Sequence, residues 1–386
     1  MATLRRQPLP PSDINAAKAK TLPRASIIVP TLNESRHIGA LLQQLIDFAP
    51  PEVTEIFVSD GGSTDGTQEI VRAFEARDRR ILLISNHGRI QAIGVNIAAK
   101  ASSPQSEVLI RMDSHAAYGN DFVKTLLTEM GRPELHSVVV RMVTVGEGCF
   151  QRAVAMVSNT AAGTGGSAHR IGAESKVVDH GHHAAFRRRT FLDLGGYDET
   201  FATNEDAEFD HRLMLKGGRI WLSVEADVRY FPRSSPFALA RQYFKYGAGR
   251  FRTMWKHRVR PKLRQLIPVL LTLYLLASFP VALLVSPIML LPLGAYGALL
   301  AGATVSALSR NPTLCTLWVP VALVVMHVSW GLGFLSAIAR WHLTRPSTPV
   351  QEAFVEPVEP SAQKERGSSV KAVSAPKPVS LPERAH

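Results

Sequence analysis

The sequence predicts an α/β domain followed by a membrane region, and three observations support this. From residue 25 onward, short β-branched runs alternate with segments of helical spacing, which is typical of a parallel sheet. Acidic residues follow several of these runs, and open α/β sheets bind ligands where their strands end. Farther along, residues 266–309 and 311–339 contain no Asp, Glu, Lys or Arg. Because about 20 apolar residues can cross a bilayer, we expect helices in a membrane there.

The expected elements follow a polar, proline-rich arm over residues 1–24, which we expect to be flexible. Residues 163–182, rich in Gly, Ser and His, predict a mobile loop, and residues 341–386 have the composition of a disordered tail. A folded domain is therefore expected over residues 25–234. Within it we expect strands at 26–30, 54–59, 81–85, 108–112, 137–143, 184–186 and 219–222, and helices at 36–48, 65–74 and 89–100.

The net charge of +12 belongs to one part of the chain. No Asp or Glu occurs between Asp227 and Glu352, whereas 14 of the 44 Lys and Arg residues lie there. The remainder of the chain is close to neutral. Because most of this basic segment is apolar, its charge indicates membrane lipid as a partner and argues against nucleic acid.

Residues 235–264 interleave aromatic and basic side chains, which predicts a helix lying in the membrane interface. We expect about three spans over residues 265–340. Basic residues near a span are retained in the cytoplasm, and the first residues do not resemble a signal peptide, so the folded domain should be cytoplasmic. Cys149 falls in that domain and Cys315 in a predicted span, so we expect neither a disulfide nor a structural metal site.

The first two strands are followed by polar motifs that suit a nucleotide. Pro30-Thr31-Leu32-Asn33-Glu34 ends the first strand, and Asp60-Gly61-Gly62-Ser63-Thr64-Asp65 ends the second. A carboxylate at a strand end can accept a hydrogen bond from a uracil N–H, and the glycines let the backbone approach. The alternative is that the second motif is only a turn whose Ser and Asp cap the next helix. Arg89, at the start of the third helix, is either a phosphate partner or an ordinary exposed arginine.

Two further acidic motifs follow. Asp113-Ser114-His115 ends the fourth strand, and a carboxylate with an imidazole suits a divalent cation, with the imidazole favouring Mn²⁺ over Mg²⁺. Alternatively, Asp113 is the only one of the two that ligates the cation, and His115 merely packs beside it. Glu205-Asp206 follows the turn at Gly195-Gly196-Tyr197-Asp198-Glu199 and is placed to supply a general base, or else it decorates a helix N-terminus.

Together these motifs resemble those of the inverting GT-A-fold glycosyltransferases (family 2), which include cellulose and hyaluronan synthases. The resemblance implies a GT-A domain whose donor nucleotide is gripped by Pro30, Leu32, Glu34 and Asp60. It implies a divalent cation, Mn²⁺ or Mg²⁺, at Asp113. The family has a second Asp where this chain has His115, so the metal ligand there departs from the pattern. The resemblance assigns the general base to Asp206, within the Glu205-Asp206 pair.

Three segments resemble those of the ExoA-type glucosyltransferases of succinoglycan biosynthesis: the triplet 187–189, the turn at 195–199 and residues 241–247. That resemblance implies transfer of glucose from UDP-glucose to a polyprenyl-diphosphate-linked saccharide at the bacterial inner membrane, alongside other exopolysaccharide assembly enzymes. Arg241, Lys245 and Arg250 are the basic residues expected to face the acceptor at the membrane. The cluster at 180–183 has poor spacing for a metal cage, so an acceptor-side or structural role is expected for it.

Three alternatives remain open. A processive polysaccharide synthase would normally show a Gln-x-x-Arg-Trp motif, of which Arg241-Gln242-Tyr243-Phe244-Lys245-Tyr246 is only a loose echo. A polyprenyl-phosphate sugar synthase attacks with a phosphate and needs no base, which would leave Asp206 without a role. A catalytically dead scaffold of a polysaccharide assembly complex would explain the histidine at position 115.

Overall fold

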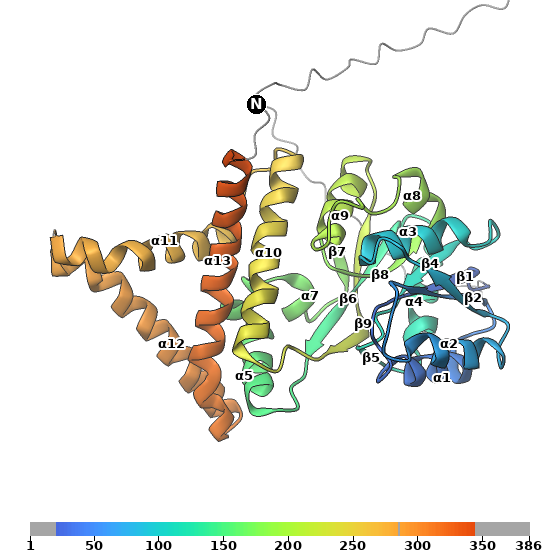
Figure 1. The fold of residues 1–386 in the computed structure, drawn as a ribbon, viewed down its shortest axis with the longest axis horizontal. Coiled ribbons are helices and arrows are strands. Elements are labelled where there is room, and N and C mark those ends of the chain that lie inside the picture. Colours follow the sequence, from blue (N-terminus) through green and yellow to red (C-terminus); the bar gives the residue numbers. More distant parts are fainter. Residues whose placement is uncertain (1–20, 285, 344–386) are drawn as a thin grey trace, which may run out of the picture. The chain divides into compact units, whose positions relative to one another are not determined.

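The computed structural model describes residues 21–284 and 286–343 (Figure 1). The predicted arm lies outside the described residues apart from residues 21–24. Of the predicted tail, residues 341–343 are described, and they continue helix α13 instead of being disordered; the rest lies outside the described residues. The strands are β1 Ala25–Thr31, β2 Val53–Asp60, β3 Ile81–Ser85, β4 Val108–Arg111, β5 Ala117–Tyr118, β6 Ser137–Thr144, β7 Lys176–Val178, β8 His182–Arg187 and β9 Ile220–Tyr230. The α-helices are α1 Ile38–Phe48, α2 Thr67–Glu75, α3 Gln91–Ala101, α4 Phe122–Met130, α5 Cys149–Ser158, α6 Ala161–Thr164, α7 Ala168–Ile171, α8 Arg188–Asp193, α9 Glu205–Leu215, α10 Pro236–Lys256, α11 Leu263–Leu284, α12 Leu291–Arg310 and α13 Val319–Leu343. Two short 3₁₀ turns, η1 Pro287–Leu290 and η2 Leu314–Trp318, flank α12.

One mixed sheet organises the domain, with strand order β3-β2-β1-β4-β8-β6-β9-β5 and β7 paired to β9. The predicted parallel arrangement holds from β3 to β4 and again between β6 and β9. It is wrong for β8, which runs antiparallel to both β4 and β6. The carboxyl ends of β1, β2 and β4 therefore meet at one edge, with Thr31 opposite Asp60.

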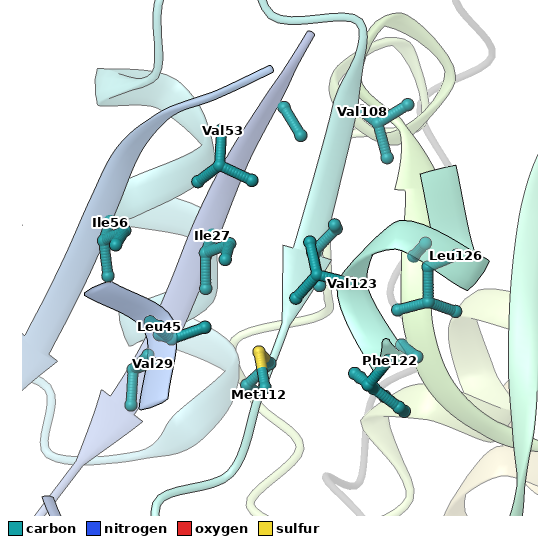
Figure 2. Packing of buried hydrophobic residues seen from close by; sticks show 14 of the residues in the cluster. Ile27, Val29, Leu45, Val53, Ile56, Val108, Met112, Phe122, Val123 and Leu126 are labelled. Carbon is teal, nitrogen blue, oxygen red and sulfur yellow. The ribbon is translucent and has the colours of Figure 1, made fainter. Parts of the chain in front are cut away.

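Successive residues of β1 supply two hydrophobic cores on opposite faces of the sheet, because side chains alternate along a strand. Ile27 and Val29 pack with Leu45 of α1 and Val123 of α4, as Figure 2 shows. Ile28 packs on the other face, in the cluster that contains Phe209 of α9. Each such fully buried side chain contributes roughly 1.5–3 kcal/mol of burial free energy, so the strand ends are held by a rigid layer.

The predicted loop over residues 163–182 is not structureless. It contains the end of α6, all of α7 and β7, and the first residue of β8. Composition did not predict these elements, because each is only three to six residues long and is stabilised by contacts with neighbouring elements. β7, for example, pairs with β9 from Lys176 to Val178.

Two helices in the described part of the chain are long and apolar enough to cross a membrane: Leu291–Arg310 and the joined segment Leu314–Leu343. Leu263–Ala277, within α11, is a shorter apolar helix. The segment that was expected to lie in the membrane interface forms α10, which packs along α13 (Figure 1).

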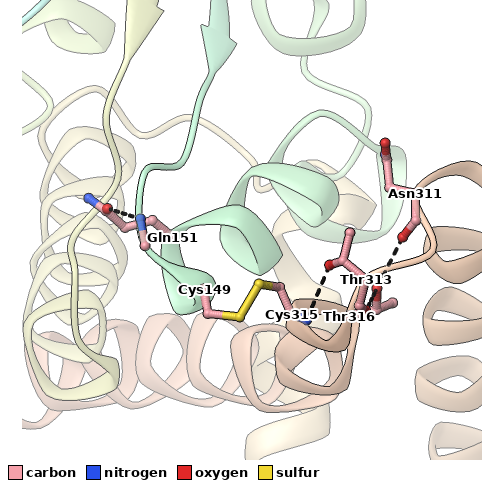
Figure 3. The surroundings of a disulfide bond; sticks show 7 residues. Cys149, Gln151, Asn311, Thr313, Cys315 and Thr316 are labelled. Atoms are coloured by element: carbon pink, nitrogen blue, oxygen red, sulfur yellow. Dashed lines mark hydrogen bonds between the residues drawn. A yellow bond between two sulfur atoms is a disulfide. The ribbon is translucent and has the colours of Figure 1, made fainter.

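Cys149 and Cys315 form a disulfide, contrary to the sequence-based expectation (Figure 3). Their Cα atoms are 4.8 Å apart, within the range that a disulfide requires. The expectation failed because it took a position in an apolar segment to mean a position away from the folded domain. The structure instead ends α12 at Arg310 and puts Cys315 on η2, against the first residue of α5.

Candidate active site

The end of β2 forms a small polar pocket around Asp60. Its Oδ2 accepts hydrogen bonds from the backbone N–H groups of Gly62 and Ser63, both at 2.9 Å, and from Gln68 Nε2 at 2.7 Å. Its Oδ1 is buried and has no hydrogen-bond partner within the described residues. A cavity of about 190 Å³ adjoins it, lined by Asp60, Gln68, Arg72, Glu75, Leu83, Ile84 and Ser85. A buried acceptor without a donor is costly, so this oxygen suits a ligand N–H.

The other predicted donor-binding residues lie around this strand end. Pro30 is in β1 opposite Ser59, and Leu32 is exposed just beyond the strand. Arg89 precedes α3 in a left-handed conformation, φ 60°, and its Nε donates to the Gly61 carbonyl oxygen at 3.2 Å. This contact brings Arg89 to the glycine turn after β2.

Glu34 connects the first motif to the second. Its Oε1 lies 2.8 Å from His115 Nδ1, and its Oε2 lies 3.0 Å from His37 Nδ1. Although burial opposes ionisation, these histidines hold the pKa of Glu34 below its usual value. The hydrogen bond to Glu34 correspondingly raises the pKa of His115. His115 thus contacts the donor-side carboxylate.

Arg111 connects the second motif to the third. Its Nε lies 3.2 Å from Asp113 Oδ1, and its Nη1 lies 3.5 Å from Glu205 Oε1. The side chain is 6% exposed, so these charges are well shielded from water. Although burial opposes ionisation, Arg111 and then His182 lower the pKa of Asp113 to about 2. The acidic motifs that are distant in sequence are therefore one connected cluster.

Asp113 and His182 have the protonation states that a cation requires. His182 Nε2 lies 3.6 Å from Asp113 Oδ2. Burial lowers the pKa of His182 to about 4, against the attraction of Asp113, so the imidazole is neutral at pH 7. No group of three or more His, Cys, Asp or Glu side chains that could hold a metal is found in the described part of the chain. A donor set of one carboxylate and one imidazole fits a cation whose remaining ligands come from a bound diphosphate.

The first two residues of α9 face different surroundings. Glu205 is 7% exposed and lies against Arg111, and burial followed by the charge of Asp206 raises the pKa of Glu205 to about 7. Asp206 is more accessible, and its Oδ1 accepts a 2.7 Å hydrogen bond from the backbone N–H of Ala207. Asp206 is therefore the member of the pair that a substrate could reach.

The three predicted acceptor-side cations lie on α10 in different surroundings. Arg241 stacks over the Phe237 ring, 5.3 Å from its centroid, and Lys245 is exposed. Arg250 is half-buried, and burial lowers its pKa while the negative charge of Asp206 opposes that shift. Arg250 is therefore within electrostatic reach of Asp206.

Sequence reasoning missed three residues of the cluster. Arg111 carried a signal, since a charged residue near the end of an otherwise apolar strand needs a buried partner. His182 stood in a histidine cluster that was not expected to lie beside Asp113. Gln68 lies one residue inside α2, and nothing in its sequence context distinguished it.

Known proteins resemble this chain in sequence and in fold. A family model described as glycosyl transferase family 2 matches residues 26–195. The chain is 40% identical over 314 residues to the succinoglycan biosynthesis protein ExoA of Rhizobium meliloti (strain 1021), covering 80% of this chain and 93% of that protein. It is 24% identical over 339 residues to a Methanococcus voltae dolichyl N-acetyl-alpha-D-glucosaminyl phosphate 3-beta-D-2,3-diacetamido-2,3-dideoxy-beta-D-glucuronosyltransferase, covering 83% of this chain and 98% of that protein.

Among solved structures, the chain resembles a mannosyltransferase from Pyrobaculum calidifontis that was determined in complex with GDP-Man and Mn²⁺. The TM-score is 0.52 and the identity 19%, covering 82% of this chain and 88% of that chain. This likeness confirms the predicted GT-A fold class.

Proposed function

This chain belongs to glycosyl transferase family 2, and from that premise we propose that it moves glucose from UDP-glucose to a polyprenyl-diphosphate-linked saccharide with inversion. One observation carries the proposal. Three acidic motifs far apart in sequence form a continuous cluster, through Glu34 with His115 and through Arg111 with Asp113 and Glu205. A donor nucleotide, a diphosphate and an acceptor hydroxyl need such groups side by side.

The donor's base is assigned to the pocket beside Asp60. The unpartnered, buried Oδ1 of Asp60 suits the N3–H of uracil, which would satisfy an oxygen that otherwise lacks a donor within the described residues. Pro30, Leu32 and Glu34 surround the neighbouring strand end, and Arg89 is placed to meet a phosphate. Because the hydrogen bonds on Oδ2 fix the carboxylate's orientation, little side-chain entropy would be lost on binding.

A divalent cation, Mn²⁺ or Mg²⁺, is assigned to Asp113 and His182. When bound, it supplies positive charge that offsets the charge on the leaving diphosphate. Asp113 contributes a charged carboxylate and His182 a neutral imidazole. His115 remains a prediction as a ligand, and in the structure its Nδ1 contacts Glu34.

The acceptor hydroxyl is assigned to Asp206. A sugar hydroxyl is a weak acid, so a positioned carboxylate that takes its proton is worth about 10²–10⁴ in rate. The hydroxyl oxygen forms the new bond to the anomeric carbon while the bond to the diphosphate breaks, which inverts that centre. Glu205 would position Arg111, because its buried carboxylate lies 3.5 Å from Arg111 Nη1.

The pathway and location are supported by the relatives and by the apolar helices. The 40% identity extends over 93% of a succinoglycan biosynthesis protein, which favours a role in bacterial exopolysaccharide assembly beside other enzymes of that process. Apolar helices long enough to cross a membrane support action at the inner membrane, and the basic residues before them favour a cytoplasmic catalytic domain.

The proposal is tested with membranes from cells that make the chain. They are incubated with bacterial lipid extract, Mn²⁺ and one radiolabelled UDP-sugar at a time. The lipid product is then identified by mass spectrometry. We expect label from UDP-glucose in an acid-labile glycolipid, and none with membranes that lack the chain. If UDP binds but no UDP-sugar gives lipid-linked or free sugar, the chain is a scaffold and the proposed activity is wrong.

A further inference from the structure

The apolar C-terminal helices differ in how much of their surface the protein covers. The apolar window of Leu291–Arg310 is 0% buried, whereas that of Leu314–Leu343 is 39% buried. Exposed leucines occur along α12. One side of α11 is buried, at Val269 and Thr272, and packs against α13, whereas Ile267, Leu270, Leu273 and Leu276 are exposed. Water is a poor environment for two such helices, so α11 and α12 need another apolar partner.

Both ends of the α11–α12 pair are attached to the catalytic domain. Before α11, Lys262 pairs with Asp179, and Arg264 at its start lies 3.5 Å from the Gly165 carbonyl oxygen. After α12, Cys315 is joined to Cys149 of α5 (Figure 3). The chain therefore leaves the domain at Arg264 and returns to it by Cys315. A segment that leaves and returns in this way is a hairpin with respect to any membrane beside the domain.

α13 packs on the catalytic domain along much of its length. Glycines allow close approach to α10: a Cβ on Gly247 would collide with the Trp330 carbonyl oxygen, and one on Gly333 would collide with that of Phe244. His327 Nε2 lies 3.0 Å from the Ala162 carbonyl oxygen. Near η2, one hydrophobic cluster joins α5, α10 and α13. Its buried members are Phe150, Ala153, Val154, Val157, Leu239, Val319, Ala322, Leu323 and Met326.

We propose that only the α11–α12 hairpin enters the lipid bilayer, and that α13 remains on the catalytic domain's side as part of its packing. At 1.5 Å per residue, each hairpin helix is roughly 30 Å long, close to the hydrocarbon thickness. Cations mark both ends: Arg258, Arg260, Lys262 and Arg264 before it and Arg310 after it. They suit anionic lipid headgroups. Leu343, at the end of α13, then lies on the same side as the active site. The inference rests on the proposed action at a membrane, but not on any transfer activity.

The test measures which side of the membrane each position faces. The test uses a Cys149→Ser/Cys315→Ser background, into which single cysteines are introduced. They replace Leu343, Ile288 in η1 at the hairpin's turn, and exposed Lys124 of α4 as the catalytic-side control. A membrane-impermeant maleimide is added to inverted and to right-side-out vesicles. We expect Leu343→Cys to label with the same sidedness as Lys124→Cys, and Ile288→Cys not to label from that side.

Labelling of Leu343→Cys from the opposite side to Lys124→Cys would overturn the proposal and support a third span. A second measurement uses the native cysteines and so does not depend on the cysteine-free background. When intact membranes are alkylated and digested without reduction, mass spectrometry should find the Cys149 and Cys315 peptides joined by their disulfide. Absence of this cross-link would contradict the attachment of the hairpin to the domain. Neither readout requires turnover, so failure of the proposed activity would leave the topology result unchanged.

Discussion

At the scale of single residues, the site depends on charges that are satisfied by partners from distant motifs. Arg111 is nearly buried between Asp113 and Glu205, and losing either partner would leave its charge uncompensated. Asp60 is the opposite case, because one of its oxygens has no partner within the described residues. The first arrangement holds the site together, and the second leaves a position for a ligand.

Asp60→Asn should weaken UDP binding about tenfold or more, which corresponds to about 1.4 kcal/mol. The amide cannot present two acceptor oxygens, so it cannot serve both the glycine turn and the uracil N–H. Isothermal titration calorimetry measures the dissociation constant for UDP in each variant. The matched control is Asp47→Asn, at an exposed position of α1, which should bind UDP as the parent does. Equal affinity in both variants would remove Asp60 from the nucleotide site.

His182→Ala should raise the Mn²⁺ concentration that gives half-maximal activity about tenfold or more, since loss of an imidazole leaves Asp113 as the remaining assigned ligand. A Mn²⁺ titration of glycolipid synthesis measures it, and exposed His342→Ala is the control. His115→Asp, in the same assay, should shift the preference toward Mg²⁺ if His115 is also a ligand. Full activity in excess EDTA would exclude the cation.

At the scale of elements, the strands that carry the motifs were predictable and the packing between elements was not. β1, β2 and β4 follow β-branched runs, so their ends, and with them Asp60 and Asp113, could be located from the sequence. β5 and β7 are too short to show a period. The disulfide was missed because hydropathy alone does not indicate where a helix ends and a 3₁₀ turn begins.

α9 and α10 are held together by Glu208, which is 0% exposed. Its carboxylate accepts from Arg212 at 2.7 Å and from Lys256 at 2.6 Å. Glu208→Gln should lower the free energy of unfolding by about 3 kcal/mol, because two cations lose their buried partner. Thermal unfolding in detergent measures this, with exposed Asp193→Asn as control. Equal melting temperatures for Glu208→Gln and the parent would contradict this role.

The pH dependence of this cluster has a definite sign. Burial opposes ionisation, but the hydrogen bonds from Arg212 and Lys256 hold the pKa of Glu208 below its ordinary 4.5. Its stabilisation is therefore complete above that pH and is lost as the pH falls through the folded-state pKa. The difference in melting temperature between the parent and Glu208→Gln should narrow below pH 4.5.

At the scale of the whole molecule, the disulfide closes a long loop, because Cys149 and Cys315 are 166 residues apart. Cys149→Ser should lower the free energy of unfolding by about 2–5 kcal/mol under oxidising conditions. With reductant present, the parent and the variant should melt together. Cys315→Ser should match Cys149→Ser, and the double variant should be no worse. If Cys149→Ser stayed less stable than the parent in reductant, the loss of stability would come from altered side-chain packing and not from the missing disulfide.

The sequence also predicted a division into a catalytic half and an acceptor half near residue 234, which stays a prediction. The structure shows that the cluster joining α5, α10 and α13 extends across that point. Truncation there would expose apolar surface of α5. Full-length variants are therefore the appropriate tests of acceptor binding, with Arg250 examined first because the charge of Asp206 acts on it.

The most direct test of the account is the activity of Asp206→Asn in the full-length protein. We predict that glycolipid synthesis falls by at least a hundredfold, the lower end of the effect of a general base. UDP affinity should stay within about threefold of the parent, because a base stabilises the transition state and not the bound donor. Asp193→Asn, at an exposed position of α8, should leave glycolipid synthesis and UDP affinity unchanged. Retention of more than about a tenth of the parent turnover in Asp206→Asn would contradict the assignment of Asp206 as the base.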